Sequence, residues 1–379
     1  MKIVAAPDSY KGCLSAIEVA RAMERGIKRA DSKIEVVSIP FADGGEGTVE
    51  AMLFGAGGHI ETTTVIGPLG DEIESFFGIL EDGSTAVIEM AAASGLSLVP
   101  ESMRNPMETT TYGTGQLILK AMDSGCRKII VGVGGSSTND GGTGMAEALG
   151  IKFFDKEAQS LLGKGKNLCK IKSFDRTGID KRIYETEIIV ACDVDNPFYG
   201  SKGAACIYAA QKGADDEMIK ELDAGLFNLS SLIKATDGFD INEIPGAGAA
   251  GGLAGGLVAF AGAKLEKGID IISKVCRLDE RIKEADLVIT GEGQTDYQTA
   301  FGKVPAGVAE SAMKFRVPVL CISGSLGKGY EDILNLGVTA AFSITPGPVS
   351  LNESMEKAAE YIENTARSVV SLWLSGKNS

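Results

Sequence analysis

Residues 2–18, KIVAAPDSYKGCLSAIE, begin with a short apolar strand and pass through a polar loop into a helix. Ser15 and Glu18 have the spacing of a capping box, in which a hydroxyl and a carboxylate satisfy each other's backbone N–H groups. Apolar residues between 17 and 27 then repeat at helical spacing. A second apolar run over 34–39 completes a β-α-β unit, which is typical of a parallel sheet covered by helices.

The same alternation of strands and helices returns in the last hundred residues. We expect strands over 286–290, 317–323 and 338–344, and helices over 305–315 and 351–374. Because the two ends of the chain share this pattern, they predict one discontinuous α/β domain made from residues 1–60 and 285–379. We expect this domain to be Rossmann-like or flavodoxin-like, with a mostly parallel sheet.

The middle of the chain follows a different pattern. β-Rich runs cover 61–66, 72–80 and 85–89, and Asp82-Gly83 between the last two is a strong hairpin signal. Antiparallel pairing of this kind distinguishes the middle from the ends. We therefore expect a second, unlike α/β domain over 61–284, inserted into the first, with the active-site cleft between the two.

Composition and charge narrow the class of protein. The length of 379 residues suggests two domains, and 44% hydrophobic with 23% charged residues is typical of a globular chain. The 49 glycines have no collagen-like period, so they indicate tight turns and close backbone approach. The net charge of −14 argues against nucleic acid and anionic membranes as partners.

Several signals predict a cytoplasmic protein. The seven cysteines include no C-x-x-C pair, which is typical of reduced thiols. Met1-Lys2 runs directly into an apolar strand, so we expect no signal peptide. The uncharged stretch 246–263 contains seven glycines and is too weakly hydrophobic for a membrane span. The single histidine, His59, argues against a Ser-His-Asp triad or a multi-histidine zinc site.

Glycine-rich loops that carry acidic residues follow several of the expected strands. The crevice beyond the carboxyl ends of parallel strands binds ligands, and N–H groups at glycine turns and helix N-termini suit phosphate. Carboxylates in the same loops suit Mg²⁺ that is shared with substrate phosphates. Any one loop can be a simple turn, but their recurrence favours phosphoryl transfer.

The best-known nucleotide motifs are absent. Gly302-Lys303 is followed by Val304, so the chain has no P-loop, and it has no protein-kinase H-R-D string. One G-x-G-x-x-G occurs at 246–251, but Pro245 precedes it where a dinucleotide fold needs a strand. A nicotinamide dehydrogenase is therefore a minor alternative.

A series of motifs runs in one order along the chain: APDSYKG at 6–12, ADGGEGT at 42–48, GGSSTNDGG at 134–142, ACDVDNP at 191–197, QKGA at 211–214, PGAGAAGG at 245–252, TGEG at 290–293 with Asp296, and GKVP at 302–305. Together these motifs resemble the bacterial glycerate kinase family of type I, the glycerate 2-kinases. The resemblance implies two unlike α/β domains, with ATP and D-glycerate as small-molecule substrates and Mg²⁺ as cofactor. It implies transfer of the γ-phosphoryl group to the 2-hydroxyl, giving 2-phospho-D-glycerate and ADP. The family usually has Arg where this chain has Gln294. If that Arg contacts a phosphate or the substrate carboxylate, another cation must replace it in this chain.

Phosphoryl transfer needs positioning, charge neutralisation and a group that accepts the hydroxyl proton. We interpret Asp193, at the end of an expected strand, as the base or a magnesium ligand. Asp195 is two residues further on, and alternate residues of an extended chain lie on the same face, so Asp195 is a metal candidate. Lys11, before a helix, can hold a phosphate or the substrate carboxylate, and Lys303 can neutralise transferred charge. The alternative for each is an exposed or turn residue.

Further candidates complete the expected site. Glu292 and Asp296 follow the strand over 286–290 and are metal candidates, and Glu46 lies in a similar loop. Lys212 is a weaker candidate cation. Candidate substrate- or nucleotide-binding residues are Asp8, Ser9, Asp43, Gly44, Gly45, Gly134, Gly135, Ser136, Ser137, Asn139, Asp140, Gly291 and Gly293. These residues do not by themselves separate an ATP side from a glycerate side.

Two further functions remain open. One is a small-anion sensor without turnover, which would use the same anion-binding loops. The other is a kinase for a related small hydroxy acid, including phosphorylation of the 3-hydroxyl of glycerate. The sequence does not predict an oligomeric state.

Overall fold

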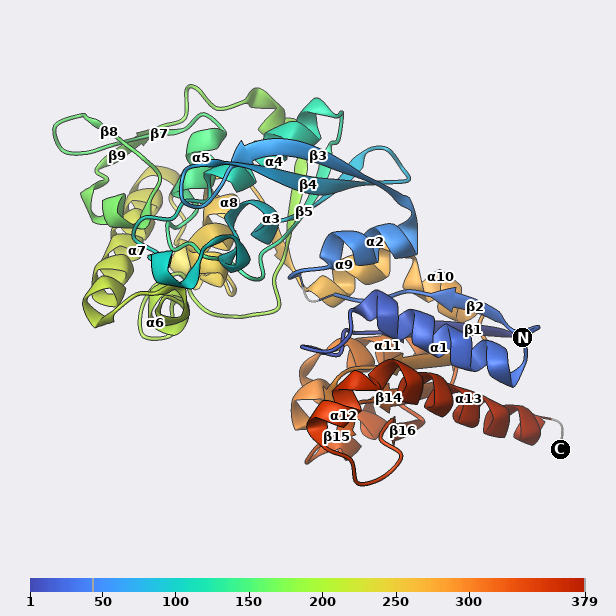
Figure 1. The fold of residues 1–379 in the computed structure, drawn as a ribbon. Coiled ribbons are helices and arrows are strands. Elements are labelled where there is room, and N and C mark those ends of the chain that lie inside the picture. The colour runs from blue at the N-terminus through green and yellow to red at the C-terminus, as the bar shows by residue number, and fades with distance from the viewer. Residues whose placement is uncertain (43, 378–379) are drawn as a thin grey trace. The chain divides into compact units, whose positions relative to one another are not determined.

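The computed structural model describes residues 1–42 and 44–377, so the candidate Asp43 lies outside the described residues. The chain divides into two compact units (Figure 1). Unit 1 comprises Met1–Ala42, Glu50–Gly57 and Ile269–Ser379, and unit 2 comprises Asp43–Val49 and Gly58–Gly268. Both ends of the chain thus belong to unit 1. Residues 269–284, which the sequence pattern places in the inserted domain, also belong to unit 1.

Unit 1 is built on a parallel sheet of five strands in the order β16-β14-β12-β1-β2. The strands are β1 (Lys2–Pro7), β2 (Glu35–Ser38), β12 (Leu287–Gly291), β14 (Val319–Ser323) and β16 (Ala340–Ser343). The chain leaves β1 toward β2 on one side, and it leaves β12 toward β14 and β16 on the other. β1 and β12 therefore flank a topological switch point. This sheet confirms the expected Rossmann-like or flavodoxin-like domain.

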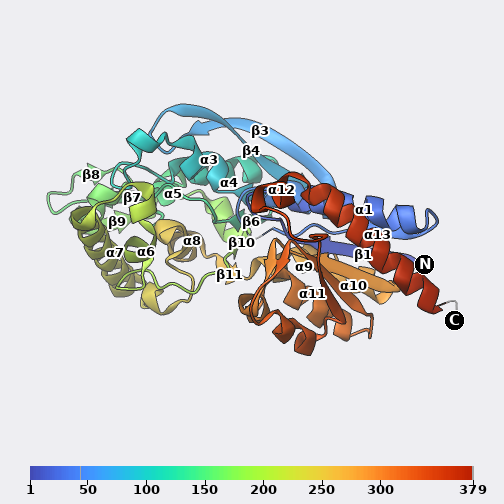
Figure 2. The ribbon, with the colours of Figure 1, turned by 60° about the horizontal axis from the view of Figure 1, so that its bottom comes forward.

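Helices cover both faces of this sheet (Figure 2). Ile3 of β1 lies in a buried cluster with α1 (Ala16–Ala30) and α13 (Ala358–Lys377). The next residue, Val4, points to the opposite face and is also fully buried, and α11 (Val304–Met313) contacts β1, β12 and β14. Burial on both faces explains why these strands are continuous apolar runs.

The two long helices of unit 1 differ in how well the sequence predicts them. The capping box of α1 is confirmed, because the Ser15 hydroxyl accepts from Glu18 N–H and the Glu18 carboxylate accepts from Ser15 N–H. The expected single helix over 351–374 is wrong. It is divided into α12 (Leu351–Glu356) and α13 at Lys357, whose φ of −102° and ψ of 10° leave the helical region. The division allows Ala358 to be buried in the cluster with α1.

Unit 2 has a mixed sheet of six strands in the order β11-β10-β6-β5-β4-β3. The strands are β3 (Gly58–Ile66), β4 (Glu72–Leu80), β5 (Thr85–Glu89), β6 (Lys128–Gly132), β10 (Glu187–Ala191) and β11 (Lys264–Glu266). β3, β4 and β5 are antiparallel, whereas β5, β6, β10 and β11 are parallel. The expected hairpin is confirmed, and the Asp82 carboxylate accepts from Ser84 and Thr85 N–H in its turn. The inserted unit is therefore α/β and unlike unit 1.

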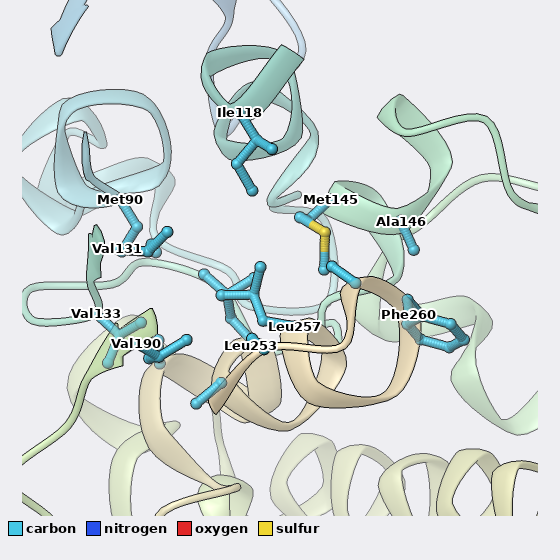
Figure 3. Packing of buried hydrophobic residues seen from close by; sticks show 14 of the residues in the cluster. Met90, Ile118, Val131, Val133, Met145, Ala146, Val190, Leu253, Leu257 and Phe260 are labelled. Atoms are coloured by element: carbon cyan, nitrogen blue, oxygen red, sulfur yellow. The ribbon is translucent and has the colours of Figure 1, made fainter. Parts of the chain in front are cut away.

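The core of unit 2 lies between this sheet and three helices (Figure 3). The helices are α4 (Tyr112–Asp123), α5 (Thr143–Ala148) and α8 (Leu253–Ala261). Ile118, Met145 and Leu257, one from each helix, are fully buried in one cluster with Val131 of β6 and Val190 of β10. This packing fixes the ends of β6 and β10, from which two of the glycine-bearing loops depart.

The remaining elements are short or peripheral. They are the helices α2 (Thr48–Ala56), α3 (Ala91–Ser94), α6 (Ala204–Tyr208), α7 (Asp216–Asp237), α9 (Gly268–Val275) and α10 (Leu278–Lys283), the strands β7 (Lys152–Phe154), β8 (Ser160–Leu161), β9 (Ser173–Asp175), β13 (Gln294–Thr295) and β15 (Ser325–Leu326), and the 3-10 helices η1 (Leu96–Leu98), η2 (Glu101–Met103), η3 (Gly165–Lys170), η4 (Lys181–Glu185), η5 (Ala210–Lys212), η6 (Ile241–Glu243), η7 (Ala249–Gly252), η8 (Tyr297–Phe301) and η9 (Tyr330–Leu336). None of the helices within residues 1–42 and 44–377 combines the length and apolar character that crossing a bilayer requires.

Candidate functional site

The candidate residues of unit 1 gather at the switch point of its sheet. Asp8 follows β1 and Glu292 follows β12, and Asp8 N–H donates to the Gly291 carbonyl at 2.8 Å. Gly291 is tightly enclosed, because a Cβ there would collide with the carbonyl of Ile322 in β14. Parallel pairing thus places side chains from neighbouring strand ends at one edge of the sheet, where ligands bind in this class of fold.

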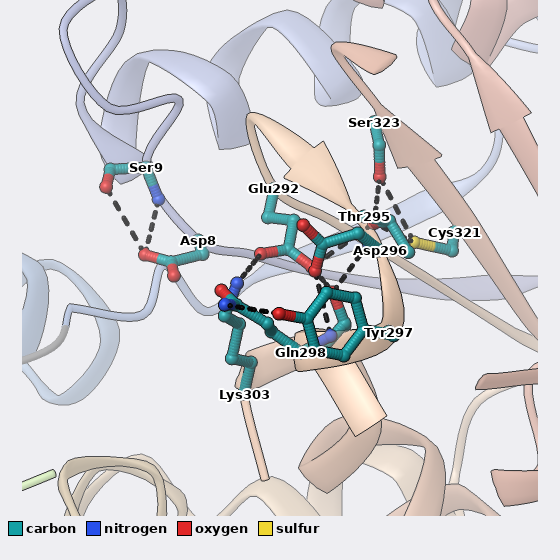
Figure 4. Close-up of polar contacts among 11 residues, drawn as sticks. Asp8, Ser9, Glu292, Thr295, Asp296, Tyr297, Gln298, Lys303, Cys321 and Ser323 are labelled. Atoms are coloured by element: carbon teal, nitrogen blue, oxygen red, sulfur yellow. Dashed lines mark hydrogen bonds and ion pairs between the residues drawn. The ribbon is translucent and has the colours of Figure 1, made fainter. Parts of the chain in front are cut away.

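Glu292 is the centre of a buried polar cluster (Figure 4). Its side chain is 8% exposed, and its carboxylate accepts from the hydroxyls of Thr299 at 2.6 Å and Thr295 at 3.2 Å. Lys303 Nζ lies 3.6 Å from the other carboxylate oxygen. Burial raises the pKa of Glu292, while the Thr299 hydrogen bond and the Lys303 charge oppose that rise. The cluster extends to Ser323 at the end of β14, whose hydroxyl lies 2.7 Å from that of Thr295.

Two cations border this cluster. Lys303 immediately precedes α11, and its side chain is 41% exposed. The free N–H groups and the dipole at a helix N-terminus favour anions, and the charge of a lysine at that position adds to this effect. Lys11 is exposed in the loop after β1, and Gly12, with φ of 73°, turns that loop toward α1. Either cation can therefore meet an anion in solvent.

The remaining candidates of unit 1 have local roles. One Asp8 oxygen accepts from Ser9 N–H at 2.6 Å and from the Ser9 hydroxyl at 3.3 Å. Asp296 caps the 3-10 helix η8 and accepts from Gln298 N–H at 2.9 Å. Gly293 lies against the 8–11 loop, since a Cβ there would be 3.4 Å from Tyr10 Cα. These contacts fix the two loops beside each other.

The carboxylates at the strand ends of unit 1 suit a Mg²⁺ ion that is bound together with a nucleotide. Across residues 1–42 and 44–377, no three His, Cys, Asp or Glu side chains gather as metal ligands. Mg²⁺ with a nucleotide needs only one or two protein carboxylates, since phosphate oxygens and waters supply the rest. Asp8 and Glu292, at the ends of adjacent strands, fit that requirement. Asp296 lies close enough to Glu292 for its charge to act on that carboxylate, and Asp195 belongs to unit 2.

Unit 2 gathers its candidate loops at one edge of its own sheet. Gly132 of β6 pairs with Ala191 of β10, so the loops 133–142 and 192–197 leave the sheet side by side. Gly44 and Gly45 cross this edge, and Gly134 N–H donates to the Gly44 carbonyl at 3.0 Å. A Cβ on Gly132 or Gly134 would collide with the 44–45 backbone, which explains the glycines.

Asp140 organises the loop 134–142 from inside. It is fully buried and accepts from Thr111 N–H and hydroxyl, both at 2.8 Å, and from the N–H groups of Gly142 and Gly144. Burial raises its pKa, and these four hydrogen bonds oppose the rise. Ser137 also has an internal partner, because its hydroxyl donates to the Ser94 carbonyl. Both side chains stabilise the loop itself.

The same loop contains polar groups that lack partners. Within the described residues, Thr138 Oγ1 and Asn139 Nδ2 and Oδ1 are buried without a hydrogen bond. Lys212 Nζ approaches from η5 and donates to the Ser136 hydroxyl and the Thr138 carbonyl, both at 2.6 Å. Burial lowers the pKa of Lys212 to about 7. Buried orphan groups in a native fold commonly mark a ligand or water site.

Asp193 and Asp195 are both exposed just after β10. Asp193 Oδ1 accepts from Gly268 N–H at 2.9 Å. The structure therefore places Asp193 at the same sheet edge as the loop 134–142, with its carboxylate accessible to solvent.

The dehydrogenase alternative is wrong on structural grounds. The glycine run 246–251 follows the 3-10 helix η6 and not a strand, so it lacks the βα turn that a dinucleotide needs. Its glycines serve close packing: a Cβ on Gly251 would collide with the Thr138 carbonyl, and one on Gly248 with the Pro197 carbonyl. The glycine run therefore packs against both candidate loops of unit 2, 133–142 and 192–197.

Sequence reasoning underestimated two features of this site. Thr138 carries an orphan hydroxyl, yet its position between Ser137 and Asn139 gave no reason to prefer it. Lys212 was only a weaker candidate cation, and nothing in the string QKGA indicates that this lysine is buried. Its 1% exposure is a tertiary property, and the sequence held no periodic signal for it.

Parallel strand ends that carry exposed cations, carboxylates and glycine turns are typical of α/β proteins that bind anionic ligands. Comparison with known proteins identifies its family. The sequence model of the glycerate kinase family matches residues 3–374, and the chain belongs to this family. This membership makes it a kinase.

Its relatives match along nearly their full lengths. A glycerate kinase of Halalkalibacterium halodurans is 47% identical over 373 residues, which cover 98% of both chains. A glycerate 2-kinase of Escherichia coli is 47% identical over 369 residues, covering 97% of both. The crystal structure of a putative glycerate kinase 2 from Salmonella typhimurium LT2 is similar with a TM-score of 0.88 and 44% identity, covering 100% of this chain and 99% of that one.

Proposed function

We propose that this protein transfers the γ-phosphoryl group of ATP to the 2-hydroxyl of D-glycerate, giving 2-phospho-D-glycerate and ADP. The observation that carries the proposal is the 47% identity, over 97% of both chains, to a relative named glycerate 2-kinase. The anion-suited strand ends of both units support it. The prediction that the active-site cleft lies between the two domains stays a prediction.

In the proposed reaction the 2-hydroxyl oxygen forms the new bond to phosphorus while the bond between the γ-phosphorus and the β-phosphate oxygen breaks. Asp193, an accessible carboxylate, accepts the hydroxyl proton. Lys303 and Lys11 neutralise charge on the transferred group or on the substrate carboxylate. Lys303 is our candidate for the cation that replaces the family's usual Arg at Gln294.

Mg²⁺ bound with the nucleotide would supply charge neutralisation and in-line orientation of the phosphates. Asp8 and Glu292 are the carboxylates that would hold it. Lys303 keeps Glu292 oriented through their ion pair, and the Thr295 and Thr299 hydroxyls fix the other oxygen.

We also propose a cytoplasmic setting. All seven cysteines are free thiols, which supports a reducing compartment. The substrates of a kinase that uses ATP are available there.

A coupled assay tests the proposed function. The protein is incubated with ATP, Mg²⁺ and D-glycerate, ADP release is measured, and ³¹P NMR identifies the product. We expect turnover with D-glycerate, with loss on chelation of Mg²⁺, and a 2-phosphate resonance. A 3-phosphate would correct the regiochemistry, and turnover only with another hydroxy acid would correct the substrate. Tight binding of either substrate without ADP release would favour the sensor instead.

A further inference from the structure

Lys212 is a buried cation that the proposed reaction does not use directly. Its side chain leaves the 3-10 helix η5 and ends beneath the loop 134–142, where it donates to the Ser136 hydroxyl and the Thr138 carbonyl. The residue is 1% exposed. A group so enclosed cannot reach a substrate in solvent, so any effect on the reaction passes through the loop.

The ammonium has no ion-pair partner among the described residues. Asp140 is the carboxylate whose charge acts on it, and both Asp140 oxygens already accept from Thr111, Gly142 and Gly144. Gly213, the residue after Lys212, lies against the backbone of Arg104. The Nε atom of Arg104 is itself buried without a hydrogen-bond partner. A buried cation without a counter-ion is costly. An evolved fold tolerates that cost where the charge has a function.

The loop that Lys212 holds is the one with unsatisfied polar groups. The Thr138 carbonyl is fixed by Lys212, while Thr138 Oγ1 and the Asn139 side chain lack partners. The Ser136 hydroxyl accepts the second Lys212 bond, and Gly135, next to it, is exposed with φ of 72°. Lys212 thus stands between the unit 2 core and the exposed start of the loop.

We propose that Lys212 is a positioning residue for phosphoryl transfer, which fixes the loop 134–142 by bridging Ser136 and Thr138 and lends that loop its positive potential. The inference rests on the proposed function, since the loop must bind an anionic substrate. Lys212 does not touch the substrate. Its removal therefore affects the rate of transfer more than the folding of unit 2.

Lys212→Met is the test, because Met keeps the length of the side chain and removes its charge and donors. Lys220→Met is the matched control, since Lys220 is exposed on α7 of the same unit. With ATP, Mg²⁺ and D-glycerate, we expect Lys212→Met to lower kcat at least 100-fold with less than a 5-fold change in KM, and Lys220→Met to leave both unchanged. Unchanged kcat in Lys212→Met overturns the proposal.

The pH profile separates positioning from a structural role. The alkaline limb of the wild-type kcat profile, where Lys212 loses its proton, is expected to disappear in Lys212→Met. Asp140 is the charged group that acts on Lys212, and it remains in the variant. An alkaline limb that persists unchanged in Lys212→Met contradicts the proposal.

A second readout does not depend on glycerate kinase activity. Amide hydrogen exchange, followed by mass spectrometry, is expected to accelerate at least 10-fold in peptides covering 134–142 of Lys212→Met and nowhere in Lys220→Met. Unchanged exchange there overturns positioning even if the protein phosphorylates another substrate. Conversely, a wild type that does not release ADP disproves the proposed function while the exchange result still decides the role of Lys212.

Ser136→Ala covers the case in which Lys212→Met does not fold. This variant removes one of the two acceptors and leaves the charge in place. We expect about a 10-fold loss of kcat, with faster exchange confined to the same peptides. Wild-type kcat together with wild-type exchange in Ser136→Ala contradicts the proposal.

Discussion

Lys212 and Glu292 are ionisable side chains whose burial disfavours their charged forms. Lys212 has a pKa of about 7 in the fold against 10.5 in a model peptide, because burial disfavours its charged form. Glu292 shows the converse, since burial raises its pKa although Lys303 and two threonine hydroxyls oppose the rise. Glu292 directly follows β12, and Lys212 lies beneath the loop that follows β6. Groups with perturbed pKa values at such positions commonly serve function.

The Lys212 shift predicts a pH dependence of stability. Between pH 7 and 10.5 the unfolded chain binds more protons at this lysine than the folded chain, so the free energy of unfolding rises with pH in that window. We expect the free energy of unfolding of the wild type, relative to that of Lys212→Met, to increase by at most about 1.4 kcal/mol per pH unit. Urea unfolding of both proteins at pH 7 and pH 9 measures the difference, and a difference that is independent of pH would contradict the burial effect.

Asp193→Asn tests the proposed base at the same scale. An amide keeps the Oδ1 acceptor for Gly268 N–H, so the fold should persist, but it cannot accept the hydroxyl proton. We expect kcat to fall by about 10²–10⁴-fold, the range for loss of a general base. Steady-state kinetics measure this loss, and Asp216→Asn, on the exposed start of α7, serves as control. Near-normal turnover in Asp193→Asn would exclude this residue as the base.

Among the elements, α1 and α13 show how a glycine acts through packing. The two helices lie side by side in both views of unit 1 (Figures 1 and 2), with Ile27 and Ile362 in their shared core. At Gly26 a Cβ would collide with the carbonyl of Glu363. The ion pairs from Arg25 and Arg29 to Glu363 flank this contact, but they are partly exposed and contribute little.

Gly26→Ala is therefore expected to destabilise the protein, opposite in sign to helix propensity. In an exposed helix Ala is favoured over Gly by about 1 kcal/mol. Here the collision must move α13, which we expect to cost about 1–3 kcal/mol. Gly376→Ala is the matched control, since that helical glycine has open space around it. Denaturant unfolding measures both, and a more stable Gly26→Ala would refute the packing argument.

Binding of a ligand is expected to raise the free energy of unfolding of the whole molecule. A ligand that binds only the folded state adds about 2.7 kcal/mol at a hundred times its Kd. We expect ATP with Mg²⁺ and D-glycerate each to raise the melting temperature, and L-glycerate to raise it less. Differential scanning fluorimetry measures the shifts. Equal shifts with both glycerate enantiomers would show that the site does not read the configuration at the carbon that carries the 2-hydroxyl.

Much of this protein was determined by local sequence. Apolar runs predict most strands of both sheets, though not β11. The Ser15–Glu18 capping box predicts the start of α1, and the Asp82-Gly83 turn predicts the hairpin. Each of these features depends on neighbours a few residues away. The likeness of the two chain ends likewise predicts a discontinuous parallel domain. Motif order places the candidate loops after strands, where the structure has them.

Only the tertiary structure decided which side chains of those loops are enclosed. Asp140, which the sequence offers as a binding residue, is saturated by Thr111 and the 142–144 backbone, whereas the weakly ranked Lys212 is the cation beneath the loop. The last helix is likewise divided at Lys357, and the next residue, Ala358, is buried in a cluster with residues of α1. Burial and hydrogen-bond partners arise from residues far apart in the chain. Local pattern therefore specifies the elements and their loops, and long-range packing assigns each loop residue its role.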